Sequence, residues 1–390
     1  MRKLRVLHFG KFYPPHRGGM ETVVASLCRG LAAKGLDCRV IAADDGSGAR
    51  SFSADGVRIR RLRSFGTVNS LPICPGAVCA LRGIEADVVN LHHPNPLADI
   101  SCLLSNANAR IVVTYHSDII RQRRLSRLHS PLLRQTLRRA DAIVATSAQY
   151  AASSPVLKEF RRKVRVIPLG YSPPSAASTH AAFDGARREP QYLFIGRLVP
   201  YKGIPVLLQA LQMVPGRLWI VGTGPLKAAL EGLPARAALD GRIEFLGDVS
   251  EEEKLCRLSE CDALVLPSTS RAEAFGIVLL EAMAMSRPVV VSDLPTGVRM
   301  LVEDGVNGYR FPPGDAAALA ASLQRLASDP ARARQMGDEG RRRFLERWTM
   351  DRMVNAYVQL YDALCSARAA RRPAMRLQAS VNRARPGEAA

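Results

Sequence analysis

The 390-residue chain lacks several features that define large protein classes. It has no apolar run near the roughly 18 residues that a membrane-spanning helix requires. Its eight cysteines include no CxxC pair, so we expect reduced, partly buried thiols rather than a zinc or redox site. The first apolar stretch is interrupted by His8, Gly10 and Lys11, which favours a first strand over a signal peptide and predicts a cytoplasmic protein.

Common nucleotide-binding and nucleic-acid-binding signatures are also missing. No GxxxxGK[ST] motif is present, so the chain has no Walker phosphate loop. Residues 221–225, Val-Gly-Thr-Gly-Pro, lack the third glycine of a dinucleotide fingerprint. No helix-turn-helix, zinc-finger or RNA-stacking signature accompanies the net charge of +20, so we expect no nucleic-acid partner.

The positive charge is concentrated in one window, residues 119–165, which carries twelve Lys or Arg against Asp141 and Glu159. Leucines recur there at helical spacing, which predicts a basic amphipathic helix. Such a surface attracts anionic lipid headgroups, and the proposed membrane and acceptor face contains Arg121, Arg123, Arg124 and Arg127. The alternative is a solvated, arginine-rich surface without a partner.

Short β-branched runs alternate with helical patterns along most of the chain, which predicts mostly parallel sheets. A chain of this length exceeds one hydrophobic core, and the pattern dissolves at 172–190, which we interpret as a linker. The predicted fold is therefore α/β, with two doubly wound, Rossmann-like domains at 1–171 and 191–349 facing a ligand-binding cleft. The expected strands are 5–9, 38–42, 57–60, 87–91, 111–115, 142–146, 164–167, 192–195, 218–221, 243–246, 263–266, 289–292 and 308–311.

The C-terminal region divides into two parts. Residues 350–365 carry Met353, Tyr357 and Leu360, and we expect a helix that crosses back to the first domain. Residues 366–390 lack a sustained apolar pattern, so we expect a mobile basic tail.

Two carboxylates, Glu273 and Glu281, flank an apolar run after the strand at 263–266. We expect Glu273 in the loop before a helix and Glu281 two turns inside it. The backbone N–H groups of Phe275, Gly276 and Ile277 would then point at an anionic ligand. Backbone amides that bind an anion, next to carboxylates that accept hydrogen bonds from hydroxyl groups, suit a phosphorylated sugar. The alternative is an amphipathic helix with a capping acid and a satisfied inner Glu.

Residues 196–203, Gly-Arg-Leu-Val-Pro-Tyr-Lys-Gly, follow the first strand of the second domain. Arg197 offers a planar fork for phosphate oxygens, and Lys202 offers a point charge for the same group. Two fixed cations can neutralise a departing diphosphate, a task that other enzymes give to a divalent metal. The alternative is an exposed basic pair.

In the first domain, polar residues follow two strands. Gly18 and Gly19 open a helix, where glycine lets the backbone approach a phosphate or sugar. His116 follows the strand at 111–115, where an imidazole can exchange a hydrogen bond with a substrate hydroxyl. His92 and His93 end the preceding strand, and we expect them to line the same cleft. A tight turn and structural histidines are the alternatives.

Together these segments resemble the retaining GT-B glycosyltransferases of family 4, also called glycosyl transferases group 1, from the first strand to about residue 350. The resemblance implies an acceptor-binding first domain and a nucleotide-sugar-binding second domain. It implies that Glu281 binds the donor ribose, that Glu273 lies against the sugar, and that His116 lies near the reacting sugar. The resemblance further implies donor contacts from Arg197, Lys202, Gly18, Gly19, Gly222, Leu246, Val249, Phe275, Gly276 and Ile277.

The function expected from this resemblance is hexose transfer, with retention, from a nucleotide diphosphate sugar, without a cofactor or metal. The sequence Tyr-His-Ser-Asp at 115–118 resembles that of family members that transfer mannose or rhamnose-type sugars from GDP donors, and we expect such a donor here. The basic window favours a polyprenyl-linked saccharide acceptor in O-antigen, exopolysaccharide or capsule synthesis, at the inner face of the cytoplasmic membrane. The alternatives are a UDP-sugar donor, a soluble acceptor, and a non-catalytic nucleotide-sugar-binding scaffold.

Overall fold

The computed structural model describes residues 3–16, 18–44, 46, 51–68, 71–119, 123–173, 189–232 and 239–383. At 123–126 and 368–383 it describes the backbone and not the side chains. Arg121, most of the predicted linker and the last residues of the predicted tail lie outside the described residues.

The first domain is built on an eight-stranded sheet in the order β10-β9-β8-β7-β1-β2-β4-β3. All neighbouring strands are parallel except the β3–β4 pair at the edge. Its strands are β1 (Arg5–Phe9), β2 (Asp37–Ala43), β3 (Ser51–Ala54), β4 (Val57–Leu62), β7 (Val88–His93), β8 (Arg110–Tyr115), β9 (Ala142–Ala145) and β10 (Val164–Val166); a separate hairpin joins β5 (Thr67–Val68) and β6 (Leu71–Pro72).

The second domain is built on a six-stranded parallel sheet in the order β13-β12-β11-β14-β15-β16. Its strands are β11 (Gln191–Ile195), β12 (Arg217–Val221), β13 (Ile243–Gly247), β14 (Ala263–Leu266), β15 (Val289–Ser292) and β16 (Gly308–Phe311). The central strands β14 and β15 are buried throughout, which explains why they read as continuous apolar runs.

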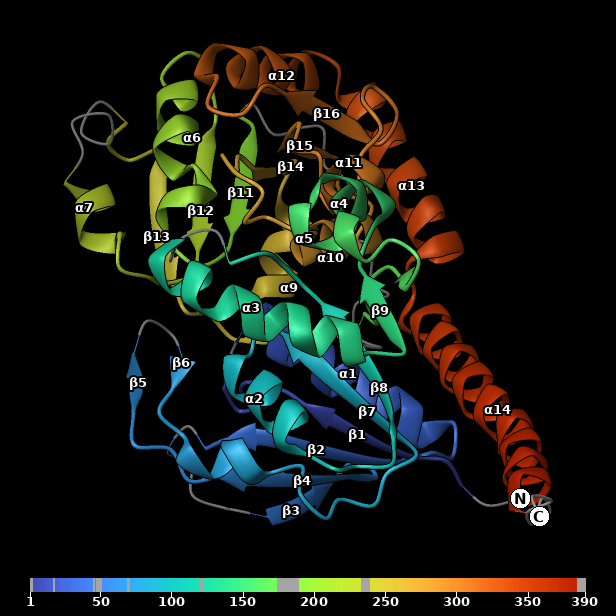
Figure 1. Ribbon diagram of the computed structural model, residues 1–390. Helices are drawn as coiled ribbons and strands as arrows, with labels where there is room; N and C mark the ends of the chain where they lie inside the picture. The colour runs from blue at the N-terminus through green and yellow to red at the C-terminus, as the bar shows by residue number, and fades with distance from the viewer. Residues whose placement is uncertain are drawn as a thin grey trace, which may run out of the picture.

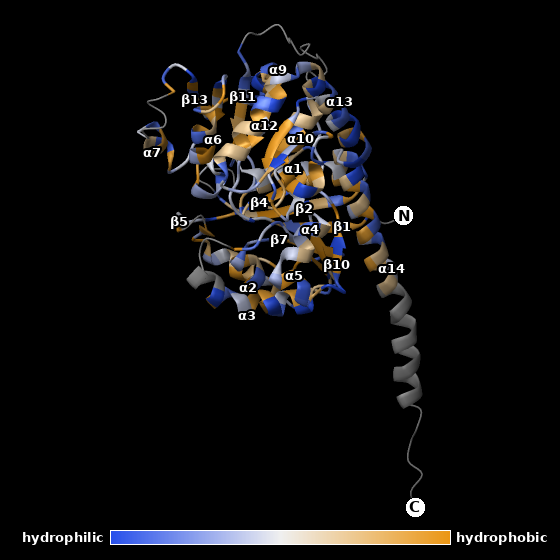
Figure 2. Ribbon diagram, turned by 90° about the horizontal axis from the view of Figure 1, so that it is seen from above, coloured by the Kyte–Doolittle hydropathy of each residue, from blue (hydrophilic) through white to orange (hydrophobic). Residues whose placement is uncertain are grey.

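Helices cover both sheets, and the two domains lie one above the other in Figure 1. Viewed from above, apolar strands such as β11 lie among helices with polar outer faces (Figure 2). The helices are α1 (Gly19–Ala33), α2 (Pro96–Leu104), α3 (Arg123–Arg139), α4 (Ala148–Ser153), α5 (Pro155–Glu159), α6 (Ile204–Leu211), α7 (Lys227–Glu231), α9 (Glu251–Glu260), α10 (Ile277–Ala284), α11 (Gly297–Leu301), α12 (Ala316–Ser328), α13 (Pro330–Arg347), α14 (Met350–Arg383) and the 3₁₀ helices η1 (Pro75–Cys79) and η3 (Pro200–Lys202).

The C-terminal helix α14 leaves the second domain and packs on the first, alongside α1 (Figure 1). The two crossing segments meet where Tyr171 pairs with Thr349. Tyr357 and Tyr361 of α14 then bond to Thr114 (3.0 Å) and Asn90 (2.8 Å) on the sheet. Burial of these tyrosines fixes the helix to the first domain.

Some details differ from the sequence-based expectations. α14 continues to Arg383, past residue 365, where the apolar pattern predicted its end. The short strands β3, β5 and β6 were not predicted because they lie mostly at the surface and carry little apolar patterning. In the described part of the chain, no helix combines the length and apolar character needed to cross a membrane.

Candidate functional site

Three loops converge at one edge of the second sheet. Parallel strands place their carboxyl ends at the same edge, where ligands of such sheets bind. The loops after β11, β12 and β14 therefore bring the segments of Arg197, Gly222 and Glu273 to this edge. At Gly222 (φ 124°), a Cβ atom would lie 2.2 Å from the carbonyl oxygen of Gly196, so glycine is required where these two loops meet.

Lys202 and Glu273 form a buried ion pair at this edge. Lys202 Nζ donates to Glu273 Oε2 at 2.6 Å, and Ser268 Oγ donates to the same oxygen at 2.8 Å. Burial works to lower the pKa of Lys202, but the Glu273 carboxylate and Tyr201 raise it above its ordinary value, so the ammonium is retained. Sequence analysis assigned Lys202 to the diphosphate and Glu273 to the sugar; the structure places the two in contact.

Arg197 occupies a different environment from Lys202. Its side chain is exposed, whereas only 7% of Lys202 is accessible. The predicted pair of equivalent cations is therefore one exposed guanidinium, at Arg197, and one buried ammonium, at Lys202, that is held by Glu273.

Glu281 lies inside α10 and is buried, with 8% of its surface exposed. It accepts a hydrogen bond from Lys254 Nζ at 3.0 Å, and Lys254 also contacts Glu251 at 2.8 Å. Burial raises the pKa of Glu281, and Lys254 opposes that rise. Lys254 was not identified from the sequence, because Glu281 lies 27 residues away and no local pattern links them.

Gly276 is the N-cap of α10 and lies in the left-handed region at φ 77°. No side chain caps this end, so its first N–H groups depend on another partner. Phe275 is buried, whereas Ile277 is partly exposed. Two further predicted donor contacts, Leu246 and Val249, are also partly buried and pack against the neighbouring core.

The glycine loop of the first domain, at Gly18 and Gly19, opens α1. Lys11 precedes this loop; burial and the charge of Arg197 lower the pKa of Lys11, and Glu21 opposes them. A Cβ at Gly18 would lie 2.2 Å from Glu21 Oε2, whereas a Cβ at Gly19 would have no neighbour within 4 Å. Gly19 therefore leaves open space at the start of α1. Lys11 was not identified from the sequence.

His116 follows β8 and is 8% exposed. Burial lowers its pKa to about 4, so the imidazole is neutral at pH 7. Its Nε2 lies 3.0 Å from Nδ1 of His92, which is fully buried. His92 therefore lies behind His116, and the expectation that it lines the cleft is wrong.

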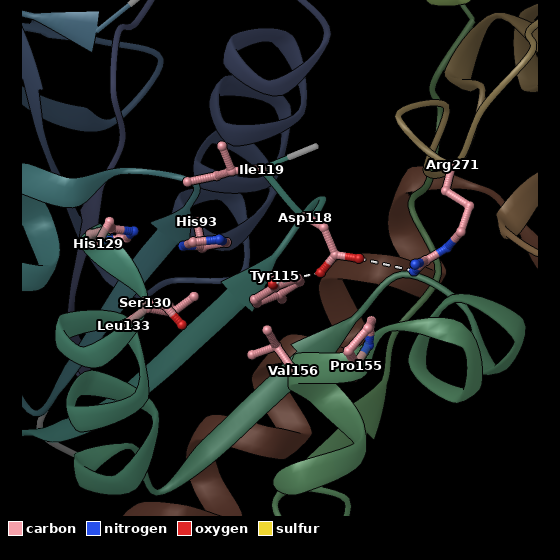
Figure 3. Close-up of a pocket in the computed structure, with 10 residues that line it drawn as sticks. All are labelled: His93, Tyr115, Asp118, Ile119, His129, Ser130, Leu133, Pro155, Val156 and Arg271. Atoms are coloured by element: carbon pink, nitrogen blue, oxygen red, sulfur yellow. Dashed lines mark hydrogen bonds and ion pairs between the residues drawn. The ribbon is translucent and has the colours of Figure 1, made fainter. Parts of the chain in front are cut away.

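A cavity of about 250 Å³ lies on the opposite face of β8 and is bordered by both domains. Figure 3 shows His93 beside Tyr115, and Asp118 directed at Arg271. Arg271, from the loop before Glu273, donates to Asp118 Oδ2 at 2.9 Å and links the domains. A second link runs from Ser153 to the carbonyl of Pro295 at 2.8 Å. Neither link was predicted, because each joins residues more than 100 positions apart.

Some basic residues of the window at 119–165 make contacts within the protein. Arg134 pairs with Glu159 at 2.7 Å, and Lys163 Nζ donates to Ala140 O at 2.8 Å near the α3 C-terminus. Arg127 is exposed, as is Leu128 at 84%. The described part of α3 therefore presents the exposed Leu128 beside the basic Arg127.

This fold and site define a class of enzyme. The sequence matches the family "Glycosyltransferase Family 4" over residues 17–173 and "Glycosyl transferases group 1" over residues 179–343. The chain belongs to glycosyltransferase family 4, has the GT-B fold and is a transferase enzyme.

Two relatives span nearly the whole chain. O-antigen chain mannosyltransferase C of Escherichia coli is 33% identical over 371 residues, covering 94% of this chain and 100% of the relative. D-rhamnosyltransferase WbpZ of Pseudomonas aeruginosa is 36% identical over 353 residues, covering 89% and 92%. Among solved structures, sucrose-phosphate synthase of Thermosynechococcus elongatus matches with a TM-score of 0.76 at 24% identity, covering 94% of this chain and 100% of that one.

Proposed function

We propose that this enzyme transfers a mannose or rhamnose-type hexose from a GDP donor to a polyprenyl-linked saccharide during surface polysaccharide synthesis. The observation that carries the proposal is the near full-length similarity to an O-antigen chain mannosyltransferase and a D-rhamnosyltransferase. The exposed Arg197, the buried Lys202–Glu273 pair and the buried Glu281 supply the polar groups that a nucleotide sugar requires.

In the proposed mechanism, positive charge stabilises the leaving diphosphate. Arg197 and the Lys202 ammonium face the phosphates, assisted by the amides at Gly19, Gly276 and Ile277. Glu281 holds the ribose hydroxyls, and Glu273 positions the sugar. The acceptor hydroxyl attacks from the same face as the departing diphosphate, with retention at the anomeric carbon. We assign no covalent nucleophile and expect turnover without a divalent metal.

A donor screen tests this function. UDP-, GDP-, ADP- and dTDP-sugars are compared in parallel by hydrolysis, with and without EDTA, and the anomeric configuration of the transferred sugar is read by NMR. We expect GDP-mannose or GDP-rhamnose to be preferred. Preference for a UDP-sugar would replace the donor assignment, and an inverted product would overturn the mechanism.

Sugar turnover, and not nucleotide binding, separates the enzyme from a scaffold. Saturating GDP should raise the melting temperature in either case, because a ligand at 100 times its Kd adds about 2.7 kcal/mol to the free energy of unfolding. Only an enzyme also turns over the sugar. Glu281→Ala should mainly weaken GDP binding, whereas Glu273→Ala should mainly lower the rate. Equal effects of the two substitutions on GDP affinity alone would contradict this division.

We further propose that the enzyme acts in the cytoplasm, bound peripherally to the inner face of the cytoplasmic membrane through α3. The support is the exposed Leu128 beside Arg127 on this basic helix. Apolar anchors combined with basic side chains bind anionic lipid surfaces. A soluble acceptor, the alternative, would require no such surface.

Liposome co-sedimentation tests the membrane proposal. We expect binding to vesicles that contain anionic lipid, and loss of binding when Arg121, Arg124 and Arg127 are all changed to Glu. The matched control changes Arg332, Arg334 and Arg347 of α13 to Glu and should retain binding. Equal binding to vesicles with and without anionic lipid would contradict the proposal.

A further inference from the structure

Three histidines form a continuous hydrogen-bonded row across three neighbouring strands of the first sheet. His8 lies on β1, His92 on β7, and His116 directly follows β8. His8 Nδ1 lies 2.9 Å from His92 Nε2, and His92 Nδ1 lies 3.0 Å from His116 Nε2. Adjacent rings stack with centroids 5.2 and 5.3 Å apart. The row runs from the protein core to the candidate site.

All three imidazoles are neutral at pH 7. Burial lowers the pKa of His8 to about 3 and that of His116 to about 4. Burial, together with the two flanking histidines, also lowers the pKa of His92. Tyr361 of α14 packs edge-on against His8, with ring centroids 6.4 Å apart, and helps to exclude water.

Neutrality restricts the hydrogen positions to two arrangements. A neutral imidazole has one N–H donor and one acceptor nitrogen, so His92 must donate one bond and accept the other. Both bonds therefore run in the same direction. If both protons are donated in the direction from His8 to His116, Nε2 of His116 accepts and His116 carries its proton on Nδ1. If both protons are donated in the direction from His116 to His8, Nε2 of His116 donates and its Nδ1 carries no proton, whereas His8 carries its proton on Nε2.

The inner end of the row decides between them. His8 Nε2 is buried and has no hydrogen-bond partner among the described residues. One ring nitrogen of His8 and the sulfur atoms of Cys28 and Cys38 all lie within 4.8 Å of one another. Burial raises the pKa of Cys28, so its thiol remains protonated and is a weak donor. His8 Nε2 is therefore unpaired in either arrangement. A bare lone pair there is the less costly of the two, because a buried N–H donor without an acceptor is rarely tolerated in a folded protein.

We infer that His8 and His92 are positioning residues that hold His116 with its proton on Nδ1, so that His116 donates a hydrogen bond to a sugar oxygen. Because Nε2 of His116 faces His92, Nδ1 is the ring nitrogen left for a ligand. His116 then acts as a donor and not as a general base. The identity of the ligand as a sugar rests on the proposed function; the tautomer does not.

NMR of protein labelled with ¹³C,¹⁵N-histidine tests the tautomer directly. Long-range ¹H–¹⁵N correlations distinguish Nδ1–H from Nε2–H, and His116→Gln assigns the signals. We expect Nδ1–H at His116 in the unmodified protein at pH 7.5, and a shift toward Nε2–H in His92→Phe and in His8→Gln. His93→Phe, on the opposite face of β7, is the control and should leave His116 unchanged.

An Nε2–H tautomer at His116 in the unmodified protein would overturn the inference, as would an unchanged tautomer in both folded variants. Two variants are used so that one can misfold without removing the test. In kinetics, His92→Phe should lower kcat at least ten-fold while the Kd for GDP stays within two-fold. If His116 shows the Nδ1–H signal but no sugar donor is turned over, the proposed function is refuted and the tautomer assignment stands.

Discussion

Lys202 Nζ lies 2.6 Å from Glu273 Oε2, although 71 residues separate them, and both side chains are 9% exposed. An ion pair so far from water is sensitive to the loss of either partner, because the remaining charge is left uncompensated. The pair therefore couples the stability of the second domain to the candidate site.

Removing one member of this pair should destabilise the protein strongly. Lys202→Met should lower the free energy of unfolding by about 3 to 5 kcal/mol, because Glu273 loses its countercharge. Adding Glu273→Gln in the double variant should recover part of that loss. Urea unfolding of the wild-type protein, Lys202→Met, Glu273→Gln and the double variant completes the cycle. The absence of coupling between the two positions would contradict this account.

Arg197 should affect the rate without affecting stability. Losing one preorganised donor to a developing charge costs about 2.7 to 4 kcal/mol, so Arg197→Ala should reduce turnover roughly 100- to 1,000-fold. Because the side chain is exposed, the free energy of unfolding should change by no more than about 0.5 kcal/mol. Lys227→Ala, another exposed cation of the same domain, is the control; turnover within a few-fold in Arg197→Ala would refute the role.

Substitution of Gly19 should affect ligand affinity, whereas substitution of Gly276 should affect stability. Gly19→Ala places a methyl group in open space and should fold normally but bind GDP or a GDP-sugar more weakly. Gly276→Ala combines φ 77° with a contact of 2.9 Å to Leu266 and should lower stability by roughly 1 to 3 kcal/mol. Thermal unfolding and ligand titration measure both effects. Unaltered affinity in Gly19→Ala would mean that no ligand approaches this helix end.

Arg271 should help to hold the domains together. Its side chain crosses from the second domain to Asp118 of the first, at 2.9 Å. Arg271→Gln should therefore increase the radius of gyration measured by small-angle X-ray scattering, with each domain still folded. Arg299→Gln breaks an ion pair within the second domain, to Asp293, and should leave the radius unchanged. Identical scattering from both variants would argue against a domain link.

The buried histidines should make the protein acid-sensitive. The unfolded chain binds a proton at each imidazole near pH 6.5, whereas the folded protein does so near pH 4 at His116 and pH 3 at His8. The unfolded state therefore binds more protons in this window, and stability falls as the pH drops from 6.5 toward 4. The His116 shift corresponds to about 3 kcal/mol. His8→Phe should flatten this decline in urea unfolding at pH 7.5 to 4.5; an equally steep decline would contradict it.

The predicted strands all occur. Buried parallel strands such as β14 and β15 have continuous apolar runs that are readable locally. Loop residues that follow strands were also predictable as site candidates, since parallel strands share one carboxyl edge. Gly19, Arg197 and Glu273 were found in this way. The sequence did not reveal that Lys202 is buried against Glu273 or that Lys254 contacts Glu281, because these partners come from different elements.

By itself, the sequence determined the alternating β/α pattern of the two sheets and the residues placed at strand ends, since periodicity and turn residues act over a few positions. Only the tertiary structure decided which of those residues touch. The row from His8 through His92 to His116 and the bond between Asp118 and Arg271 join residues 24 to 153 positions apart. Their geometry depends on strand order and domain packing, which no local pattern encodes.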